Sequence, residues 1–175
     1  QAVPPTSFLA TVRRVPRLFR RFLPVLPAAT PVRGAYLWGG VGRGKTLMMD
    51  AFFEWLPFDD KRRYHFHRIM SRVHGRLAEL RDVQDPLASV AADFAREARV
   101  ICFDEFFVSD IADAMLLGRF IESLIEQGVT LVATSNSAPE DLYRGGLQRQ
   151  RFLPAIDLLV RHTEVVHVDG LVDYR

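Results

Sequence analysis

The chain has 175 residues, of which 49% are apolar and 25% are charged, and its formal net charge is +2. This composition fits one globular domain whose core is large enough to fold without disulfides. No apolar run is long enough for a membrane span, and the single cysteine, Cys102, excludes an internal disulfide. These features together predict a reducing, cytoplasmic compartment.

The first 33 residues differ in charge from the rest of the chain. They carry six arginines and no acidic residue, which leaves 17 basic and 21 acidic residues in the remainder. Pro16 and Pro24 bound a short amphipathic helix candidate at 17–23. Such a segment suits peripheral contact with a lipid surface or an organellar transit sequence, but packing of its aromatic side on the domain is favoured. We therefore divide the chain into a basic, Pro-rich segment, 1–33, and a core, 34–175.

A glycine-rich motif follows an apolar strand at 35–38 and precedes a helix at 46–56. Residues 39–46 read GGVGRGKT and match G-x-x-x-x-G-K-[ST] at every defined position. Glycines adopt positive φ, so several backbone N–H groups can surround a phosphate at the start of the helix. The motif predicts an ATP site whose binding residues are Gly39, Gly40, Val41, Gly42, Arg43, Gly44, Lys45 and Thr46. Within it, Lys45 would reach the β- and γ-phosphates and the Thr46 hydroxyl would be a ligand of Mg²⁺.

A second strand is expected at 63–67, with His65 and His67 on one face. A His-x-His pair can bind a metal ion, but no acidic residue or cysteine is close in sequence, so packing or hydrogen bonding is favoured. Helices are expected at 71–81 and from Pro86 onward, the second of them burying apolar residues spaced for one helix face.

Two carboxylates end the next apolar strand, at 99–103. Asp104 and Glu105 follow four apolar residues directly. At the carboxyl end of a parallel strand, beside a phosphate loop, Asp104 would hold Mg²⁺ and Glu105 would orient and polarise the attacking water. An acidic helix cap would explain one of these carboxylates but not the pair.

A long helix at 111–127, capped by Ser109 and Asp110, leads to a strand at 129–134 and a polar pair ending in Asn136. The helix would bury Ile111, Met115, Phe120 and Leu124. The Asn136 amide can bridge the γ-phosphate and the attacking water, as a sensor residue does. The alternative is turn chemistry, because Ser137 and Glu140 have the spacing of a capping box; Ser137 suffices for that cap and leaves Asn136 free.

Arg149 and Arg151 follow two glycines and precede a helix, which would bury Ile156, Leu159 and Val160, and a last strand at 165–168. Arginines in this position can reach the γ-phosphate of a neighbouring subunit and act as a finger in trans. The alternative is a solvated arginine at the start of a helix, and the sequence does not choose between the two residues.

The order of these elements resembles the AAA+ ATPases, with a three-layer α/β/α P-loop fold and a five-stranded parallel sheet in the order 5-1-4-3-2. Five motifs narrow the resemblance to the ZapE, or AFG-type, ATPase family. They are PVRGAYLWGGVGRGKT (31–46), HFHRIM (65–70) with Val73 and His74, CFDEF (102–106), DIADAM (110–115) and LQRQRFLP (147–154).

The resemblance implies Mg²⁺-dependent ATP hydrolysis coupled to remodelling of a protein partner, and assembly into a homo-oligomer. Members of the family include a bacterial cell-division ATPase that destabilises FtsZ polymers, and mitochondrial relatives tied to protein quality control. The family continues for a long second portion after the position of Arg175, so we expect the chain to be part of a longer protein.

Two other functions remain open at this point. A helicase-loader-like module associated with nucleic acid is motivated by the Arg-rich segment, although nucleic acid is the disfavoured partner. A nucleotide-dependent scaffold would bind without turnover. Guanine specificity is disfavoured because no Asn-Lys-x-Asp follows the fourth strand, and a small-molecule kinase is disfavoured because Glu105 follows Asp104 directly.

Overall fold

The computed structural model describes residues 32–80 and 82–169. Within them, five parallel strands form one sheet in the order β2-β3-β4-β1-β5. The strands are β1 (Gly34–Trp38), β2 (Lys61–His65), β3 (Val100–Asp104), β4 (Thr130–Ser135) and β5 (Thr163–His167). This is the predicted order read from the opposite edge, so the predicted topology is confirmed. The helix candidate at 17–23 lies outside the described residues.

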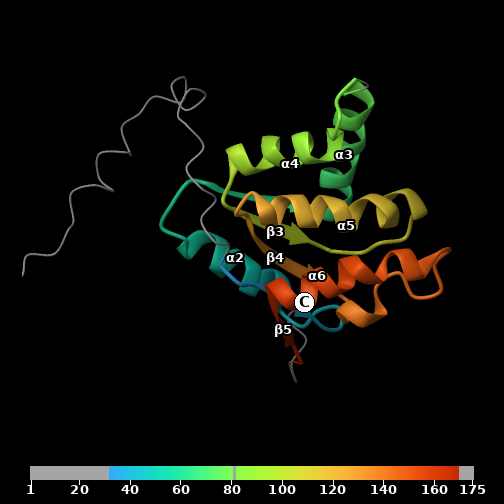
Figure 1. Ribbon diagram of the computed structural model, residues 1–175. Helices are drawn as coiled ribbons and strands as arrows, with labels where there is room; N and C mark the ends of the chain where they lie inside the picture. The colour runs from blue at the N-terminus through green and yellow to red at the C-terminus, as the bar shows by residue number, and fades with distance from the viewer. Residues whose placement is uncertain (1–31, 81, 170–175) are drawn as a thin grey trace, which may run out of the picture.

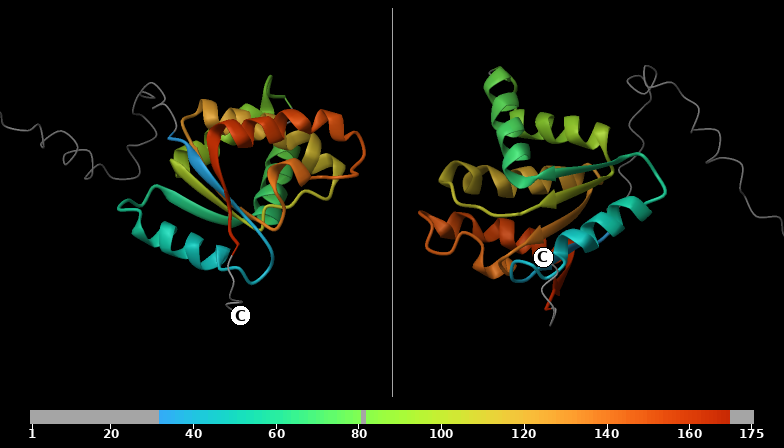
Figure 2. Two further views of the ribbon diagram at one scale, coloured as in Figure 1. Left: turned by 90° about the horizontal axis from the view of Figure 1, so that it is seen from below. Right: turned by 180° about the vertical axis from the view of Figure 1, so that it is seen from behind.

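The helices make the outer two of three layers (Figure 1). One face of the sheet is covered by α2, and the other is covered by the remaining helices, as the two further views in Figure 2 show. The helices are α2 (Lys45–Trp55), α3 (Phe66–Glu79), α4 (Pro86–Glu97), α5 (Ile111–Glu126) and α6 (Leu153–His162). In the described part of the chain, no helix has both the length and the apolar content that a bilayer crossing requires.

Alternation along the strands divides the apolar residues between two cores of unequal size. Tyr36, Phe103 and Leu131 belong to the large core beneath α3, α4, α5 and α6. Cys102 and Val132 point to the other face, where they form a small cluster with Met49 of α2 and Val100. Burial raises the pKa of the Cys102 thiol to about 12. The phosphate-loop helix is therefore supported by a thin core.

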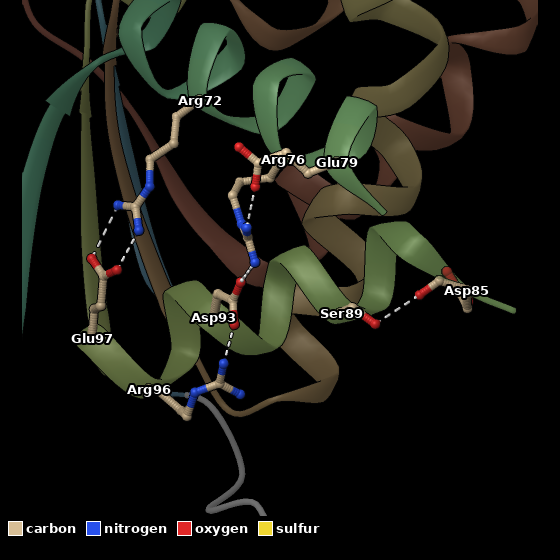
Figure 3. A network of polar contacts seen from close by, with 8 residues as sticks. All are labelled: Arg72, Arg76, Glu79, Asp85, Ser89, Asp93, Arg96 and Glu97. Atoms are coloured by element: carbon tan, nitrogen blue, oxygen red, sulfur yellow. Dashed lines mark hydrogen bonds and ion pairs between the residues drawn. The ribbon is translucent and has the colours of Figure 1, made fainter. Parts of the chain in front are cut away.

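Polar contacts join α3 to α4 (Figure 3). Arg72 forms a bidentate pair with Glu97, and Arg76 lies 3.0 Å from Asp93. These side chains are partly exposed, so each such pair contributes little free energy. The network lies on the helical layer, away from the phosphate loop on the opposite face.

Two predicted element boundaries are wrong. The second strand ends at His65, and α3 begins at Phe66 rather than at residue 71, so His67 lies in the first turn of a helix. The cause is helical spacing, because Phe66, Ile69 and Val73 face the large core as one stripe. The capping box is also wrong: a short 3-10 turn, Pro139–Asp141, follows Ala138 and has no side-chain cap.

The buried faces of two helices are confirmed in part, since Ile156 and Leu159 of α6 and Phe120 and Leu124 of α5 are buried as predicted. Val160 is 43% exposed, since α6 buries Ala155, Ile156 and Leu159. In α5 the buried stripe is centred on Leu117, Phe120, Ile121 and Leu124, while Ile111 and Met115 are only partly buried. The predicted cap of α5 is confirmed, because the Asp110 carboxylate accepts from the N–H groups of Ala112 and Asp113.

Candidate nucleotide-binding site

The predicted site residues lie at one edge of the sheet because all five strands are parallel and their carboxyl ends meet there. Trp38, immediately before the phosphate loop, pairs with Ser135 in β4, and His65 pairs with Asp104 in β3. Among the described residues, six polar or charged ones are buried: Lys45, Asp104, Ser123, Thr134, Ser135 and Thr163. Four of these six residues, Lys45, Asp104, Thr134 and Ser135, lie at this edge of the sheet. Buried polar groups gathered in one place indicate a functional site.

Glycine geometry shapes the phosphate loop. Gly42 and Gly44 have φ values of 78° and 82°, a conformation that favours glycine. A β-carbon at Gly39 would lie 2.3 Å from the carbonyl oxygen of Val168. Gly44 directly precedes α2, so the loop ends at the positive end of the helix dipole. The loop backbone is therefore open to an anion, as the motif predicted.

Lys45 is held inside the loop. Its Nζ donates to the carbonyl oxygens of Gly39 and Gly40, both at 2.7 Å. The residue is 9% exposed, and desolvation lowers the pKa of its ammonium group. The loop thus places the ammonium group of Lys45 close to its own backbone. A bound phosphate could accept hydrogen bonds from this ammonium group and from the backbone N–H groups of the loop.

Asp104 is paired with an arginine from the neighbouring strand. Nε of Arg63 donates to Oδ2 of Asp104 at 2.5 Å and Nη2 donates to Oδ1 at 3.3 Å, while Nη1 pairs with Asp50 of α2. Burial disfavours the charge of Arg63, but hydrogen bonds to the two carboxylates give a net rise in its pKa. Arg63 therefore connects the strand that carries Asp104 to the helix that carries Thr46.

Glu105 leaves the sheet with an unusual backbone. Its φ is 53°, in the left-handed region, and its side chain is 77% exposed. Nδ1 of His65 lies 3.8 Å from its carboxylate. The turn at Glu105 thus separates its side chain from that of Asp104, which points to the α2 face with Arg63.

His65 and His67 do not share one face of a strand, contrary to the prediction, but their rings do pack together, which was the favoured expectation. Their rings stack with centroids 6.0 Å apart, one at the end of β2 and the other in α3. Across 32–80 and 82–169, no group of three or more His, Cys, Asp or Glu side chains is arranged to hold an ion. His65 instead lies near the carboxylate of Glu105, a residue far from it in the sequence.

Two adjoining hollows receive these side chains. One of about 550 Å³ is lined by the loop residues 41–47 together with Asp50, Glu105 and residues 134–136. The second, of about 430 Å³, adjoins Arg63, Tyr64, His65 and Asp104. Thr46, Glu105 and Thr134 line both hollows, whereas Asp104 lines the smaller one alone.

This donor set fits the predicted nucleotide and metal. Mg²⁺ is usually bound by one or two protein oxygens with waters and substrate phosphates. Thr46 and Asp104 are such oxygens, and both line the 430 Å³ hollow. The open loop, the ammonium of Lys45 and an adjoining volume in the range of small-molecule sites suit a polyphosphate.

The two arginines have different environments. Both lie in a short 3-10 turn, Arg149–Arg151. Arg149 donates from Nη2 to the carbonyl oxygen of Glu140, and its Nε is buried without a hydrogen-bond partner. Arg151 is exposed and donates to the side chain of Gln148 at 3.0 Å. Arg149 is therefore committed to its own domain, and Arg151 is presented to solvent.

Sequence reasoning missed Arg63, Asp50 and Thr134. Asp50 could have been found, since it lies one helical turn after Thr46 and so on the same face of α2. Arg63 alternates with Lys61 and His65 along β2, and this polar face was the available signal. The Thr134 hydroxyl gave no signal, because a threonine in a strand is ordinary.

Comparison with known proteins identifies the family of the chain. A family model described as AFG1-like ATPase matches residues 6–175. Over 146 residues the chain is 60% identical to the cell division protein ZapE of Escherichia coli (strain K12). The aligned segment covers 83% of this chain and 39% of ZapE. Over 156 residues it is 42% identical to lactation elevated protein 1 homolog B of Danio rerio, covering 83% of this chain and 31% of that relative.

The fold also recurs in a solved structure. Domain III of the replication initiation protein DnaA from Thermotoga maritima matches with a TM-score of 0.61 at 14% identity, covering 97% of this chain and 65% of that one. Similarity at this level shows a shared fold. The family match extends over nearly the whole chain, although the chain spans only 39% of the length of ZapE. The chain belongs to the AFG1-like ATPase family.

Proposed function

We propose that this domain binds ATP with Mg²⁺ and hydrolyses it. The observation that carries the proposal is that the phosphate loop, Glu105 and Asn136 line one hollow at this sheet edge, and that Asp104 lines a second hollow that shares Thr46, Glu105 and Thr134 with the first. Family membership supports the same activity. The domain division, with a basic segment at 1–33 and an ATP-binding core at 34–175, is part of the proposal.

The residues divide the chemistry among them. The N–H groups of the loop and the ammonium of Lys45 bind the phosphates, and Thr46 and Asp104 would hold Mg²⁺, which would supply charge neutralisation for the phosphates. The carboxylate of Glu105 accepts a proton from water, and the Asn136 amide orients that water against the γ-phosphate. Because the side chains of Asp104 and Glu105 point in different directions, Asp104 can serve the metal while Glu105 serves the water.

The proposed partner is a protein polymer. The support is the 60% identity to ZapE, a cell division protein, together with the resemblance to a family that includes a cell-division ATPase acting on FtsZ polymers. We propose that hydrolysis in the full-length, homo-oligomeric protein is coupled to remodelling of an FtsZ-like filament. Cytoplasmic location follows from that partner.

The activity is tested in the full-length protein with Glu105→Gln. The variant keeps the charge of Asp104 and the loop, so ATP binding stays within about twofold of wild type, and turnover falls by a factor of about a hundred or more. Glu122→Gln, an exposed acid on α5, is the matched control and keeps wild-type turnover. Wild-type turnover in Glu105→Gln would show that Glu105 is a surface acid.

The partner is tested by adding FtsZ filaments, or single-stranded DNA in a parallel series, to the wild-type protein. ATP turnover rises and light scattering from the filaments falls if the partner is FtsZ. Stimulation by DNA alone, with binding that weakens steeply as salt increases, would instead support the helicase-loader alternative. Binding of ATP without turnover in any series would support the scaffold alternative.

A further inference from the structure

The backbone of Glu105 has to be held in place. Glu105, Tyr143 and Gln148 are the non-glycine residues with positive φ in the described part of the chain. Such a conformation is unfavourable for a side chain longer than hydrogen and persists where the surroundings fix it. Of the three, Glu105 belongs to the candidate site, so what holds its φ of 53° also sets the direction of its carboxylate.

The contacts that hold it come from two consecutive residues of β4. The N–H of Glu105 donates to Oγ1 of Thr134 at 3.3 Å, and the N–H of Phe106 donates to the carbonyl oxygen of Thr134 at 2.7 Å. Oγ of Ser135 donates to the carbonyl oxygen of Phe106 at 2.8 Å. Three backbone groups at and beyond the turn are therefore tied to Thr134 and Ser135.

The same two residues lead directly to Asn136. The N–H of Ser137 donates to Oγ of Ser135 at 3.2 Å, and the phenol of Tyr36 donates to the carbonyl oxygen of Ser137 at 3.1 Å. Asn136 thus lies between two residues that are both fixed by the network. The hydroxyls are inside the domain, since Thr134 is 4% exposed and Ser135 is 2% exposed. Breaking a buried hydrogen bond leaves a polar group unsatisfied, which costs free energy. The hydrogen bonds of these hydroxyls therefore hold the backbone around Glu105 and Asn136 rigidly.

We propose that Thr134 and Ser135 are positioning residues that hold Glu105 and Asn136 as one unit. Their hydroxyls fix the backbone on either side of the two groups that would handle water, so the carboxylate and the amide keep a constant separation. The role rests on the proposed ATP hydrolysis. It predicts that removal of either hydroxyl lowers turnover while nucleotide affinity is retained, because the network meets the phosphate loop through the backbone carbonyl of Ser135, which accepts from the N–H of Gly39 at 3.2 Å and is kept in both variants.

The kinetic test uses Thr134→Val and Thr134→Ser in the full-length protein. Valine keeps the shape and removes the hydroxyl, so kcat falls about tenfold to a hundredfold while KM stays within about twofold. Serine keeps the hydroxyl and restores kcat. Thr130→Val is the matched control at the other end of β4, where the hydroxyl donates to the carbonyl oxygen of Val32, and it keeps wild-type kcat. Wild-type kcat in Thr134→Val, or equal losses in Thr134→Val and Thr134→Ser, overturns the proposal.

Amide hydrogen exchange tests the same contacts without nucleotide or turnover. In Thr134→Val the Glu105 amide exchanges at least about tenfold faster, and in Ser135→Ala the Ser137 amide does, while Val132 inside β4 is unchanged in both. Faster exchange with unchanged kcat would show a merely structural tether, and unchanged exchange would show that the hydroxyls do not hold the turn. If wild-type protein lacks turnover, the proposed function fails while exchange still decides whether Thr134 and Ser135 fix the site.

Discussion

Arg63 donates to both carboxylate oxygens of Asp104, from Nε at 2.5 Å and from Nη2 at 3.3 Å. Asp104 has a side chain that is 11% exposed, so a buried carboxylate obtains its counter-charge from the adjacent strand. The remaining nitrogen of Arg63 pairs with Asp50, four residues after Thr46 on α2. Because the core beneath α2 is thin, this bridge also joins the phosphate-loop helix to the sheet.

We predict that Arg63→Met destabilises the nucleotide-free protein by about 2 kcal/mol, because Asp104 keeps its burial and loses its partner. Urea unfolding of the full-length protein measures this change. Arg62→Met is the matched control on the same strand, since Arg62 donates to backbone carbonyl oxygens and to neither acid. Equal unfolding free energies of the two variants would contradict a structural role for the pair.

Lys45→Ala is predicted to weaken ATP binding by about tenfold to a hundredfold, because a charge-assisted contact to the β- and γ-phosphates is lost. Calorimetric titration with a non-hydrolysable ATP analogue and Mg²⁺ checks it. Arg144→Ala removes an exposed cation away from the hollows and leaves affinity unchanged. Wild-type affinity in Lys45→Ala would rule out the phosphate-loop assignment.

The positive φ of Glu105 predicts that glycine at this position gives a more stable protein than alanine, the reverse of the order expected within a helix. Glu105→Gly is expected to be more stable than Glu105→Ala by about 1 kcal/mol, because alanine is strained in the left-handed region. The same pair of substitutions at Glu122, within α5, has the opposite order, because glycine disfavours a helix. Thermal or urea unfolding distinguishes these orders, and equal stability at position 105 would mean that the turn relaxes.

Arg151, rather than Arg149, is the arginine that we expect to act in trans. Arg151→Ala should keep ATP affinity and lose turnover per subunit, whereas Arg149→Ala should mainly lose stability, because the Glu140 carbonyl loses its donor. In the full-length protein, wild-type turnover per subunit should also rise with protein concentration. Steady-state turnover and urea unfolding of both variants separate these effects.

A mixing experiment decides whether the arginine serves another subunit. Arg149/Arg151 double alanine protein has an intact phosphate site, and Lys45→Ala protein has intact arginines, so a mixed interface restores a complete site. Partial recovery of turnover on mixing is expected. No recovery, together with turnover independent of wild-type concentration, would assign both arginines to the fold of their own subunit.

The sequence by itself predicted the candidate site residues that lie in local motifs. Residues 39–46 specify the phosphate loop because glycine spacing and the following helix act within a few residues. Asp104, Glu105 and Asn136 were found because polar groups end apolar strands, and parallel strands bring their carboxyl ends to one edge. The sheet order was predicted from the family resemblance and is confirmed by the strand pairing, whereas the start of α3 was missed because Phe66 fits either a strand or a helix.

Only the tertiary structure decided which side chains from different strands touch. Arg63 and Asp104 are 41 positions apart, and Glu105 and Thr134 are 29 apart, so no local pattern connects them. Their contacts depend on strand register, on which face each residue takes and on a single left-handed backbone angle at Glu105. These are properties of packed strands, since a shift of one residue would turn every side chain to the other face of the sheet.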